Sequence, residues 1–186
     1  MSNMFTYSQE SLEKVEFALS KYPEDRKQSA VMPLLDIAQR QNDGWLSKSA
    51  IEHVASYLEM PYIKVFEIVT FYSMYYTTPV GKYFVQVCTT TPCWLKGSDE
   101  VVKACKEVIS IDQNKLSRDG LFSWMEVECL GACVNAPLIQ INDDFYEDLN
   151  YENTKNVLQS LIDGNPSPIG SQIGRKGSRA QQHVKR

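Results

Sequence analysis

The chain has 186 residues, of which 43% are hydrophobic, and a formal net charge of −4. This length and composition are typical of a globular protein with one or two domains. No apolar run approaches the ~18 residues of a membrane span, and the first residues resemble neither a secretory signal nor a mitochondrial presequence. We therefore expect a chain that is not inserted in a membrane. Its five cysteines, an odd number, are typical of a reducing compartment.

Apolar residues recur at helical spacing in four stretches between residues 8 and 77. The stripes are Leu12, Val15, Leu19 and Tyr22; Val31, Leu34, Leu35 and Ala38; Ile51, Val54, Ala55 and Leu58; and Tyr62, Val65, Phe66 and Val69. Ser8 and either Ser47 or Ser49 are suitable N-caps, and Pro61 suits the first turn of the last helix. The sequence therefore predicts an N-terminal helical bundle over residues 1–79. No residue in it indicates catalysis.

The fourth stretch runs into an aromatic segment at residues 71–76. We interpret this segment as core, with a partner-binding surface as the alternative, because aromatic residues and methionine are also enriched at interfaces. His53 lies opposite the apolar stripe of the third stretch, and we expect it to face solvent.

The pattern changes near residue 80, where β-type and helical segments begin to alternate. Strands are predicted at residues 83–87, 122–128, 138–141 and 145–147. One helix is predicted from Ser98 to about Ile109, and another follows Asn150 and ends at Gly164. The order β-α-β-β-β-α predicts an α/β domain over residues 80–164. The fold class is therefore α+β, a helical domain followed by an α/β domain.

Residues 165–186 differ from the rest of the chain, because they contain five basic residues and no acidic residue. Glycine is frequent there and large apolar side chains are few, so this segment lacks the apolar surface needed to fold alone. We expect a basic flexible tail, either solvated or docked on an acidic partner surface. The basic residues lack interleaved aromatic residues, so nucleic-acid binding is not expected.

Four of the five cysteines form two close pairs, Cys88 with Cys93 and Cys129 with Cys133, separated by 35 residues. Each pair follows one of the first two predicted strands. A strand-helix-strand crossover favours parallel strands, whose carboxyl ends share one edge of the sheet. The two pairs are therefore expected to converge there. Cys105 lies on the apolar face of the intervening helix, where a cysteine acts as a small buried hydrophobe.

Four thiolates without a nearby histidine suit zinc or an iron-sulfur cluster, and they exclude a Rieske centre. The segment between the pairs is longer than the ~15 to 20 residues of a four-cysteine zinc ribbon, and the four-residue loop matches plant-type [2Fe-2S] spacing. Spacing therefore favours iron-sulfur, and zinc remains the alternative. Thr89, Thr90 and Thr91 are candidate hydroxyl donors or simple turn formers, and Trp94 is expected to shield one side of the site.

Two segments carry a resemblance to a known family. They are Val-Cys-Thr-Thr-Thr-Pro-Cys-Trp-Leu-Lys-Gly at 87–97 and Glu-Cys-Leu-Gly-Ala-Cys-Val-Asn-Ala-Pro at 128–137. Together they closely resemble the thioredoxin-like [2Fe-2S] subunit of respiratory NADH:quinone oxidoreductase, complex I. The resemblance extends over most of residues 10–163.

This resemblance implies a thioredoxin-like α/β domain that holds one [2Fe-2S] cluster on Cys88, Cys93, Cys129 and Cys133. It also implies an electron-transfer subunit with no catalytic residue of its own, which exchanges one electron with the FMN of a partner. That partner, a flavoprotein, would bind NADH and FMN, and other peripheral-arm subunits would adjoin it. The expected location is cytoplasmic, on the inner face of the bacterial inner membrane, or the matrix side in an organelle, with membrane contact only through the complex.

Two alternatives accompany this interpretation. The first is the equivalent iron-sulfur subunit of an NAD-linked formate dehydrogenase or hydrogenase. The second, from a different class, is a zinc-stabilised interaction module without redox function. The chain contains no Gly-x-Gly-x-x-Gly segment, so binding of the nicotinamide and the flavin is assigned to the partner.

Overall fold

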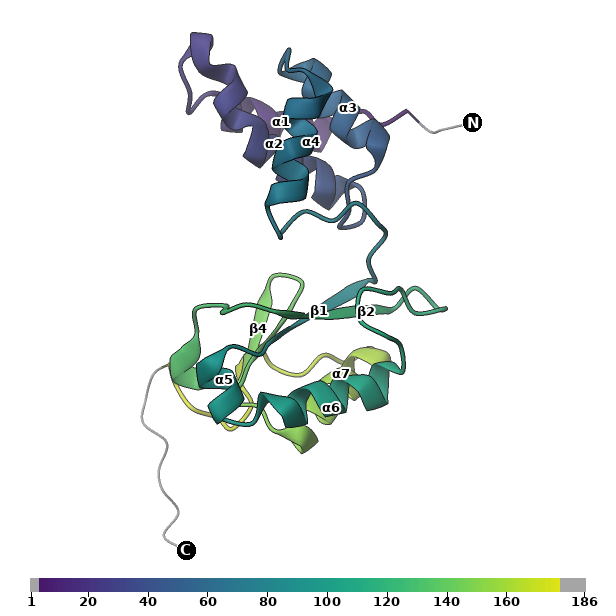
Figure 1. Ribbon diagram of the computed structural model, residues 1–186, viewed down its shortest axis with the longest axis vertical. Coiled ribbons are helices and arrows are strands. Elements are labelled where there is room, and N and C mark those ends of the chain that lie inside the picture. The colour runs from purple at the N-terminus through teal and green to yellow at the C-terminus, as the bar shows by residue number, and fades with distance from the viewer. Residues whose placement is uncertain (1–3, 178–186) are drawn as a thin grey trace, which may run out of the picture. The chain divides into compact units, whose positions relative to one another are not determined.

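The computed structural model describes residues 4–177 and divides the chain into two compact units, with the division between Val80 and Gly81 (Figure 1). Each unit has its own hydrophobic core, as is expected of an independently folding domain. The division lies one residue beyond the boundary expected from the sequence.

The N-terminal unit is built from helices. They are α1 (Gln9–Leu19), a 3₁₀ helix (Glu24–Ala30), α2 (Val31–Gln41), α3 (Lys48–Tyr57) and α4 (Tyr62–Phe71). Two of the predicted caps are present: the hydroxyl oxygens of Ser8 and Ser47 accept hydrogen bonds from the backbone N–H groups of Ser11 and Ala50, each at 3.2 Å. These bonds satisfy donors that have no partner within the first turn of a helix.

The predicted apolar stripes face the interior of this unit. The second and third stripes are buried in full, and Val15, Val65 and Val69 are buried in α1 and α4. Two buried tyrosines connect the ends of the unit to α2: the Tyr7 hydroxyl donates to the Leu34 carbonyl, and the Tyr75 hydroxyl donates to the Met32 carbonyl, both at 2.9 Å. Each hydroxyl group therefore has a hydrogen-bond partner while the ring that carries it is buried.

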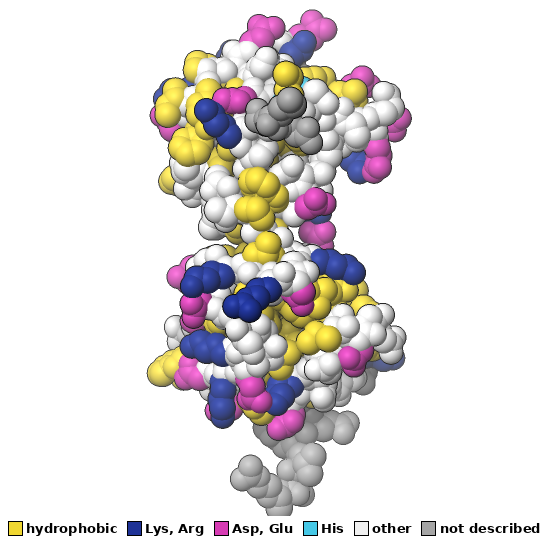
Figure 2. Space-filling model, turned by 90° about the vertical axis from the view of Figure 1, so that its right-hand side faces the viewer, with side chains coloured by type: hydrophobic (Ala, Val, Ile, Leu, Met, Phe, Trp, Pro, Cys, Tyr) yellow, Lys and Arg dark blue, Asp and Glu magenta, His cyan; other side chains and the backbone are white. Residues whose placement is uncertain are grey.

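The interpretation of the aromatic segment as core is wrong for most of its length. Tyr75 is buried, but Phe71 is 79% exposed, and Tyr72 and Met74 are also exposed. The reason is that α4 ends at Phe71, so the helical spacing that buries Val65 and Val69 does not continue. Apolar side chains, in yellow, reach the surface of both units on the face shown in Figure 2.

His53 also differs from its expected position. Its ring lies among the rings of Phe5, Tyr7 and Tyr57, with centroid distances of 5.0 to 6.2 Å, and its Nε2 atom is buried. The residues that cover it include two from the segment before α1, which no helical pattern in the sequence could place. Burial lowers the pKa of His53.

The C-terminal unit contains one mixed sheet with strand order β2-β1-β3-β4-β5. Its elements are β1 (Tyr83–Cys88), α5 (Thr91–Leu95), α6 (Ser98–Ile109), β2 (Phe122–Val127), a 3₁₀ turn (Cys133–Asn135), β3 (Ile139–Ile141), β4 (Asp144–Glu147), α7 (Tyr151–Ile162) and β5 (Gly170–Ser171). β1 and β2 are parallel, β1 with β3 and β3 with β4 are antiparallel, and β4 with β5 is parallel. The predicted order β-α-β-β-β-α is confirmed, with α5 and β5 added.

Helices α6 and α7 lie side by side against one face of the sheet (Figure 1). The Lys155 ammonium of α7 and the Glu107 carboxylate of α6 form an ion pair at 2.7 Å. Between helices and sheet lies a core that includes Val85, Trp124 and Leu158. The predicted cap of α7 is present, because Asn150 and Asn153 exchange side-chain to backbone hydrogen bonds.

The expectation of a flexible tail from Asn165 is wrong for residues 165–177. This stretch folds back along the sheet, where β5 pairs with Tyr146 and Glu147 of β4. Its Arg175 forms an ion pair with Asp148, and the two side chains are 8% and 0% exposed. Net charge misled the expectation, since the acid that neutralises Arg175 lies 27 residues earlier in the sequence. Residues 178–186 lie outside the described part of the chain.

Candidate metal centre

The first cysteine pair lies at the end of β1. Cys88 is the last residue of the strand, and Cys93 lies in the short helix α5 that follows. Both side chains are fully buried, against Ala136 and Leu138. The Thr90 side chain makes no capping bond at the start of α5, and its Oγ1 atom lies instead 3.3 Å from the Cys88 sulfur.

The second pair follows β2. Cys129 is exposed and Cys133 is half-buried at the start of a 3₁₀ turn, and their sulfurs are 3.2 Å apart. Gly131 lies between them with φ of +86°, in the left-handed region that glycine adopts without strain. This conformation directs the Gly131 N–H toward the Cys129 sulfur at 3.4 Å.

The two loops meet at one edge of the sheet, as parallel pairing of β1 and β2 requires. Cys88 is opposite Val127 in the register, so both strands end together. Contacts then cross between the loops: the Leu130 backbone hydrogen-bonds the Cys88 sulfur, and Thr90 hydrogen-bonds the Cys129 sulfur. The structure therefore places both cysteine pairs at the same edge of the sheet.

Within each pair, the pKa values of the two thiols move in opposite directions. Burial raises the pKa of the Cys88 thiol, but hydrogen bonds led by Thr90 and the Leu130 backbone outweigh burial and place that pKa below its usual value. Burial, together with the hydrogen bond and charge of Cys88, raises the pKa of Cys93 to about 12.

The second pair behaves similarly. The Gly131 N–H and the hydrogen bond with Cys133 lower the pKa of Cys129, whereas the bond with Cys129 and burial raise the pKa of Cys133. In each pair, therefore, one thiol gives up its proton more readily than the other. Binding of a metal at all four sulfurs releases the protons that these thiols carry.

The donor set suits a metal centre with thiolate ligands, as zinc and iron-sulfur centres have. Among residues 4–177, no three His, Cys, Asp or Glu side chains lie close enough together to hold a metal ion. Two cysteine pairs at a shared edge of the sheet are the ligand set of a [2Fe-2S] centre with four cysteines.

Two expectations about neighbouring residues have different outcomes. Cys105 is fully buried in the core between α6 and the sheet, apart from the two pairs, and burial raises its pKa to about 12. Trp94, expected to shield one side of the site, is 58% exposed. Leu95 and Val134 are also exposed, so an apolar residue next to each cysteine pair reaches the surface.

Sequence reasoning missed the residues that support the second loop. Asn135 and Asp148 are buried polar residues, and Arg175 contacts both of them. The sequence around Asn135, two residues after Cys133, has no pattern that would indicate a buried polar residue. An arginine in a glycine-rich, basic segment was a weak signal at most.

The chain is similar in sequence to proteins of one family. A family model described as thioredoxin-like [2Fe-2S] ferredoxin matches residues 15–162. The chain is 52% identical over 158 residues to a NADH-quinone oxidoreductase subunit of Rickettsia typhi, covering 85% of this chain and 93% of that protein. It is 48% identical over 178 residues to the mitochondrial NADH dehydrogenase [ubiquinone] flavoprotein 2 of Dictyostelium discoideum, covering 96% and 72%.

Among solved structures, the chain is similar to a NAD⁺-reducing [NiFe]-hydrogenase in its H₂-reduced state, with a TM-score of 0.62 and 16% identity. The match covers 72% of this chain and 22% of the hydrogenase chain. At this level of identity the likeness concerns the fold.

Proposed function

The chain belongs to the thioredoxin-like [2Fe-2S] ferredoxin family, and we propose on that basis that it is the electron-transfer subunit of an NADH:quinone oxidoreductase. The observation that carries the proposal is 52% identity to a subunit of that enzyme across 93% of the relative's length, together with four cysteines in two adjacent pairs. The hydrogenase alternative has only a similar fold in its favour.

We propose Cys88, Cys93, Cys129 and Cys133 as the ligands of one [2Fe-2S] cluster. When bound, such a cluster takes up and releases one electron at a time. The chain supplies four thiolates and hydrogen bonds to their sulfurs from Thr90, Leu130 and Gly131. These bonds stabilise negative charge at the site, which increases on reduction, and so they favour the reduced state.

The chain also sets the exposure of the site. Cys88 and Cys93 are sealed from water on the sheet side, whereas Cys129 is exposed on the outer side. This asymmetry leaves one side of the site open to a redox partner. We propose that the partner is a flavoprotein that binds NADH and FMN, since the chain has no dinucleotide-binding glycine motif of its own.

Among residues 4–177, no helix is long and apolar enough to cross a membrane. We propose that the subunit reaches the membrane only through the rest of the complex, on the inner face of the bacterial membrane or the matrix side of its mitochondrial counterpart. The helical N-terminal unit, with its exposed Phe71 and Met74, is proposed to pack against neighbouring subunits.

The ligand assignment is tested by counting iron and acid-labile sulfide per chain in the wild type and in single cysteine variants. Each of Cys88→Ala, Cys93→Ala, Cys129→Ala and Cys133→Ala is expected to lose most of the cluster, because one anchoring thiolate is gone. The matched control, Cys105→Ala, is expected to keep it at a packing cost of about 1 kcal/mol. Stoichiometric zinc without sulfide in the wild type would overturn the proposal and support the zinc-stabilised module.

The proposed role is tested with the partner. The isolated chain should be reduced by dithionite and remain oxidised with NADH, because binding of the nicotinamide is assigned to the partner. Rapid reduction of the isolated chain by NADH would contradict the division of roles between the two proteins.

A further inference from the structure

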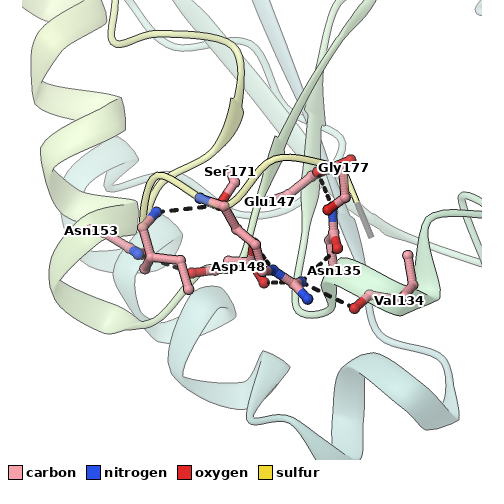
Figure 3. A network of polar contacts seen from close by, with 9 residues as sticks. Val134, Asn135, Glu147, Asp148, Asn153, Ser171 and Gly177 are labelled. Carbon is pink, nitrogen blue, oxygen red and sulfur yellow. Dashed lines mark hydrogen bonds and ion pairs between the residues drawn. The ribbon is translucent and has the colours of Figure 1, made fainter. Parts of the chain in front are cut away.

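A network of buried polar contacts links the C-terminal strap, defined as residues 165–177, to the second cysteine loop (Figure 3). At its centre is the Arg175 guanidinium, whose Nε donates to the Asp148 carboxylate at 3.0 Å and whose Nη2 donates to the other oxygen of the same carboxylate. The Ser171 hydroxyl donates to Asp148 at 2.7 Å. A bidentate contact of this kind fixes the orientation of the guanidinium and also pairs its charge with that of the carboxylate.

The same guanidinium reaches the loop that contains Cys133. Its Nη2 also donates to the Val134 carbonyl at 3.1 Å and to the Asn135 side-chain oxygen at 2.5 Å. Val134 and Asn135 are the two residues that follow Cys133. One arginine of the strap therefore holds the backbone and a side chain of the turn in which Cys133 lies.

Further bonds fix the loop to the end of β4. Asn135 donates from its side-chain nitrogen to Glu147 at 2.6 Å and to the Gly177 carbonyl at 3.2 Å. The Asp148 N–H donates to the Asn135 carbonyl at 2.8 Å. Asn135 is thus held both by the strap and by the end of β4, as Figure 3 shows.

The second loop needs such support more than the first. Cys88 and Cys93 are fixed by burial in an apolar cluster, whereas Cys129 is exposed and Cys133 only half-buried. Packing against the core is therefore weaker at the second pair, and hydrogen bonds must determine where its sulfurs lie. The residues matched by the family model end at 162, before the strap begins.

We propose that the strap positions the second cysteine loop for cluster binding and that Arg175 is its positioning residue, an inference that rests on the proposed function. Arg175 acts through Val134, Asn135 and Asp148. By these contacts it holds Cys133, and through the turn also Cys129, in the orientation that the cluster requires.

The test compares four full-length chains carrying the cluster: wild type, Arg175→Gln, Arg175→Lys and the matched control Lys176→Gln. Lys176 is the exposed neighbour of Arg175, so its variant removes the same charge without touching the network. Loss of the visible absorption in the presence of an iron chelator measures cluster retention. The spectrum of the dithionite-reduced cluster in electron paramagnetic resonance reports its ligand geometry, and hydrogen exchange of the Asp148 amide in the cluster-free chain reports the loop.

We expect Arg175→Gln to lose the cluster at least roughly tenfold faster than wild type, with shifted resonance lines and faster exchange at Asp148, because loss of a network of this kind around ligands typically costs ~10- to 100-fold in metal affinity. Lysine keeps the positive charge but cannot make the bidentate contact. Arg175→Lys should therefore lose the cluster at a rate between those of wild type and Arg175→Gln, and it should fold even if the glutamine variant does not. Lys176→Gln should match wild type. The inference is overturned if both Arg175 variants match Lys176→Gln, or if they lower the thermal stability while the resonance lines and the Asp148 exchange stay unchanged.

Failure of the inference can be told from failure of the proposed function. If the wild type contains no inorganic sulfide, the proposed function fails. If the wild type holds the cluster and the Arg175 variants hold it equally well, only the positioning role fails.

Discussion

Thr90 is the residue whose side chain contacts both halves of the candidate site. Its hydroxyl lies 3.3 Å from the Cys88 sulfur and also hydrogen-bonds Cys129. The sequence allowed two interpretations for the three threonines of this loop, turn formers or hydroxyl donors. In the structure, the Thr90 side chain contacts the Cys88 sulfur and does not cap α5. Such a choice depends on where the second loop lies, which local sequence cannot specify.

Replacing Thr90 with valine keeps the shape of the side chain and removes the hydroxyl. Because the reduced cluster carries more negative charge than the oxidised one, loss of a donor should lower the reduction potential. A lost hydrogen bond of ~1.4 kcal/mol corresponds to about 60 mV for a one-electron couple. Potentiometric titration of wild type and Thr90→Val measures the shift, with Thr90→Ser as the control that restores the donor. An unchanged potential in the valine variant would contradict the assigned contact.

Cys105 offers a test of burial that is independent of the cluster. Its pKa is raised to about 12 by burial, whereas an unfolded thiol titrates near ~8.5. The folded chain therefore keeps the proton as pH rises from about 9 to 12, while the unfolded chain loses it, so this thiol stabilises the fold less and less across that window.

The corresponding measurement is alkylation of the cluster-free chain at about pH 9, just above the pKa of an unfolded thiol. Reaction requires thiolate and access, so Cys129, which is exposed, should be modified first and Cys105 last. Mass spectrometry of the peptides gives the order. Addition of denaturant should make Cys105 react as rapidly as the others, and rapid modification of Cys105 without denaturant would show that the core around α6 opens readily.

At the scale of elements, the sequence predicts correctly those helices that show a periodic apolar stripe or a recognisable N-cap. The stripes on α2 and α3 are buried as predicted, and Asn150 caps α7 as predicted. The elements that were missed are short. α5 has five residues and β5 has two, so neither is long enough to show a repeating pattern. Both are fixed by contacts with distant segments, and both lie beside the cysteine loops or their supports.

The backbone of Gly81 lies very close to the backbone of β2, and no sequence pattern indicated this contact. A Cβ atom placed there would lie 2.3 to 2.6 Å from backbone atoms of Phe122 and Ser123, and the Gly81 N–H donates to the Ser123 hydroxyl at 2.9 Å. Backbone cannot move aside cheaply, so Gly81→Ala should push β1 away from β2.

We expect Gly81→Ala to lower the free energy of unfolding by about 2 to 3 kcal/mol, in the range of overpacked cores. Urea denaturation followed by circular dichroism measures this. Lys82→Ala, at the next and exposed position, is the control and should change stability by less than about 0.5 kcal/mol. Equal midpoints for the two variants would show that the strands separate without difficulty at this end.

At the scale of the whole molecule, the distribution of charge along the sequence predicts a folded body followed by a basic tail from residue 165. The fold divides the chain differently. The part of the C-terminal segment described by the structure belongs to the sheet, through β5 and the buried pair of Arg175 and Asp148. Breaking a buried pair by removing one partner is commonly destabilising by ~3 to 5 kcal/mol. Composition could not show this, because the pair joins residues far apart in the sequence.

Two shortened chains separate the roles of the strap and of the residues beyond it. A chain that ends at Gly164 lacks β5 and Arg175, and it should bind the cluster poorly. A chain that ends at Gly177 keeps the network, and its absorption spectrum should equal that of the full chain. Loss of the spectrum in both chains, or in neither, would contradict the assignment of the strap to the folded domain.

The chain ending at Gly177 also lacks Arg179, Lys185 and Arg186, three of the five basic residues that follow Asn165. Exposed ion pairs contribute roughly 0.2 to 1 kcal/mol each, so if all three residues pair with an acidic surface of the flavoprotein, the affinity should fall by about threefold to about 150-fold. The difference should shrink at high salt, where the Debye length is only ~3 Å at about 1 M. Titrations of both chains against the flavoprotein at low and high ionic strength measure this, and equal affinities at low salt would show that these charges do not contribute to docking.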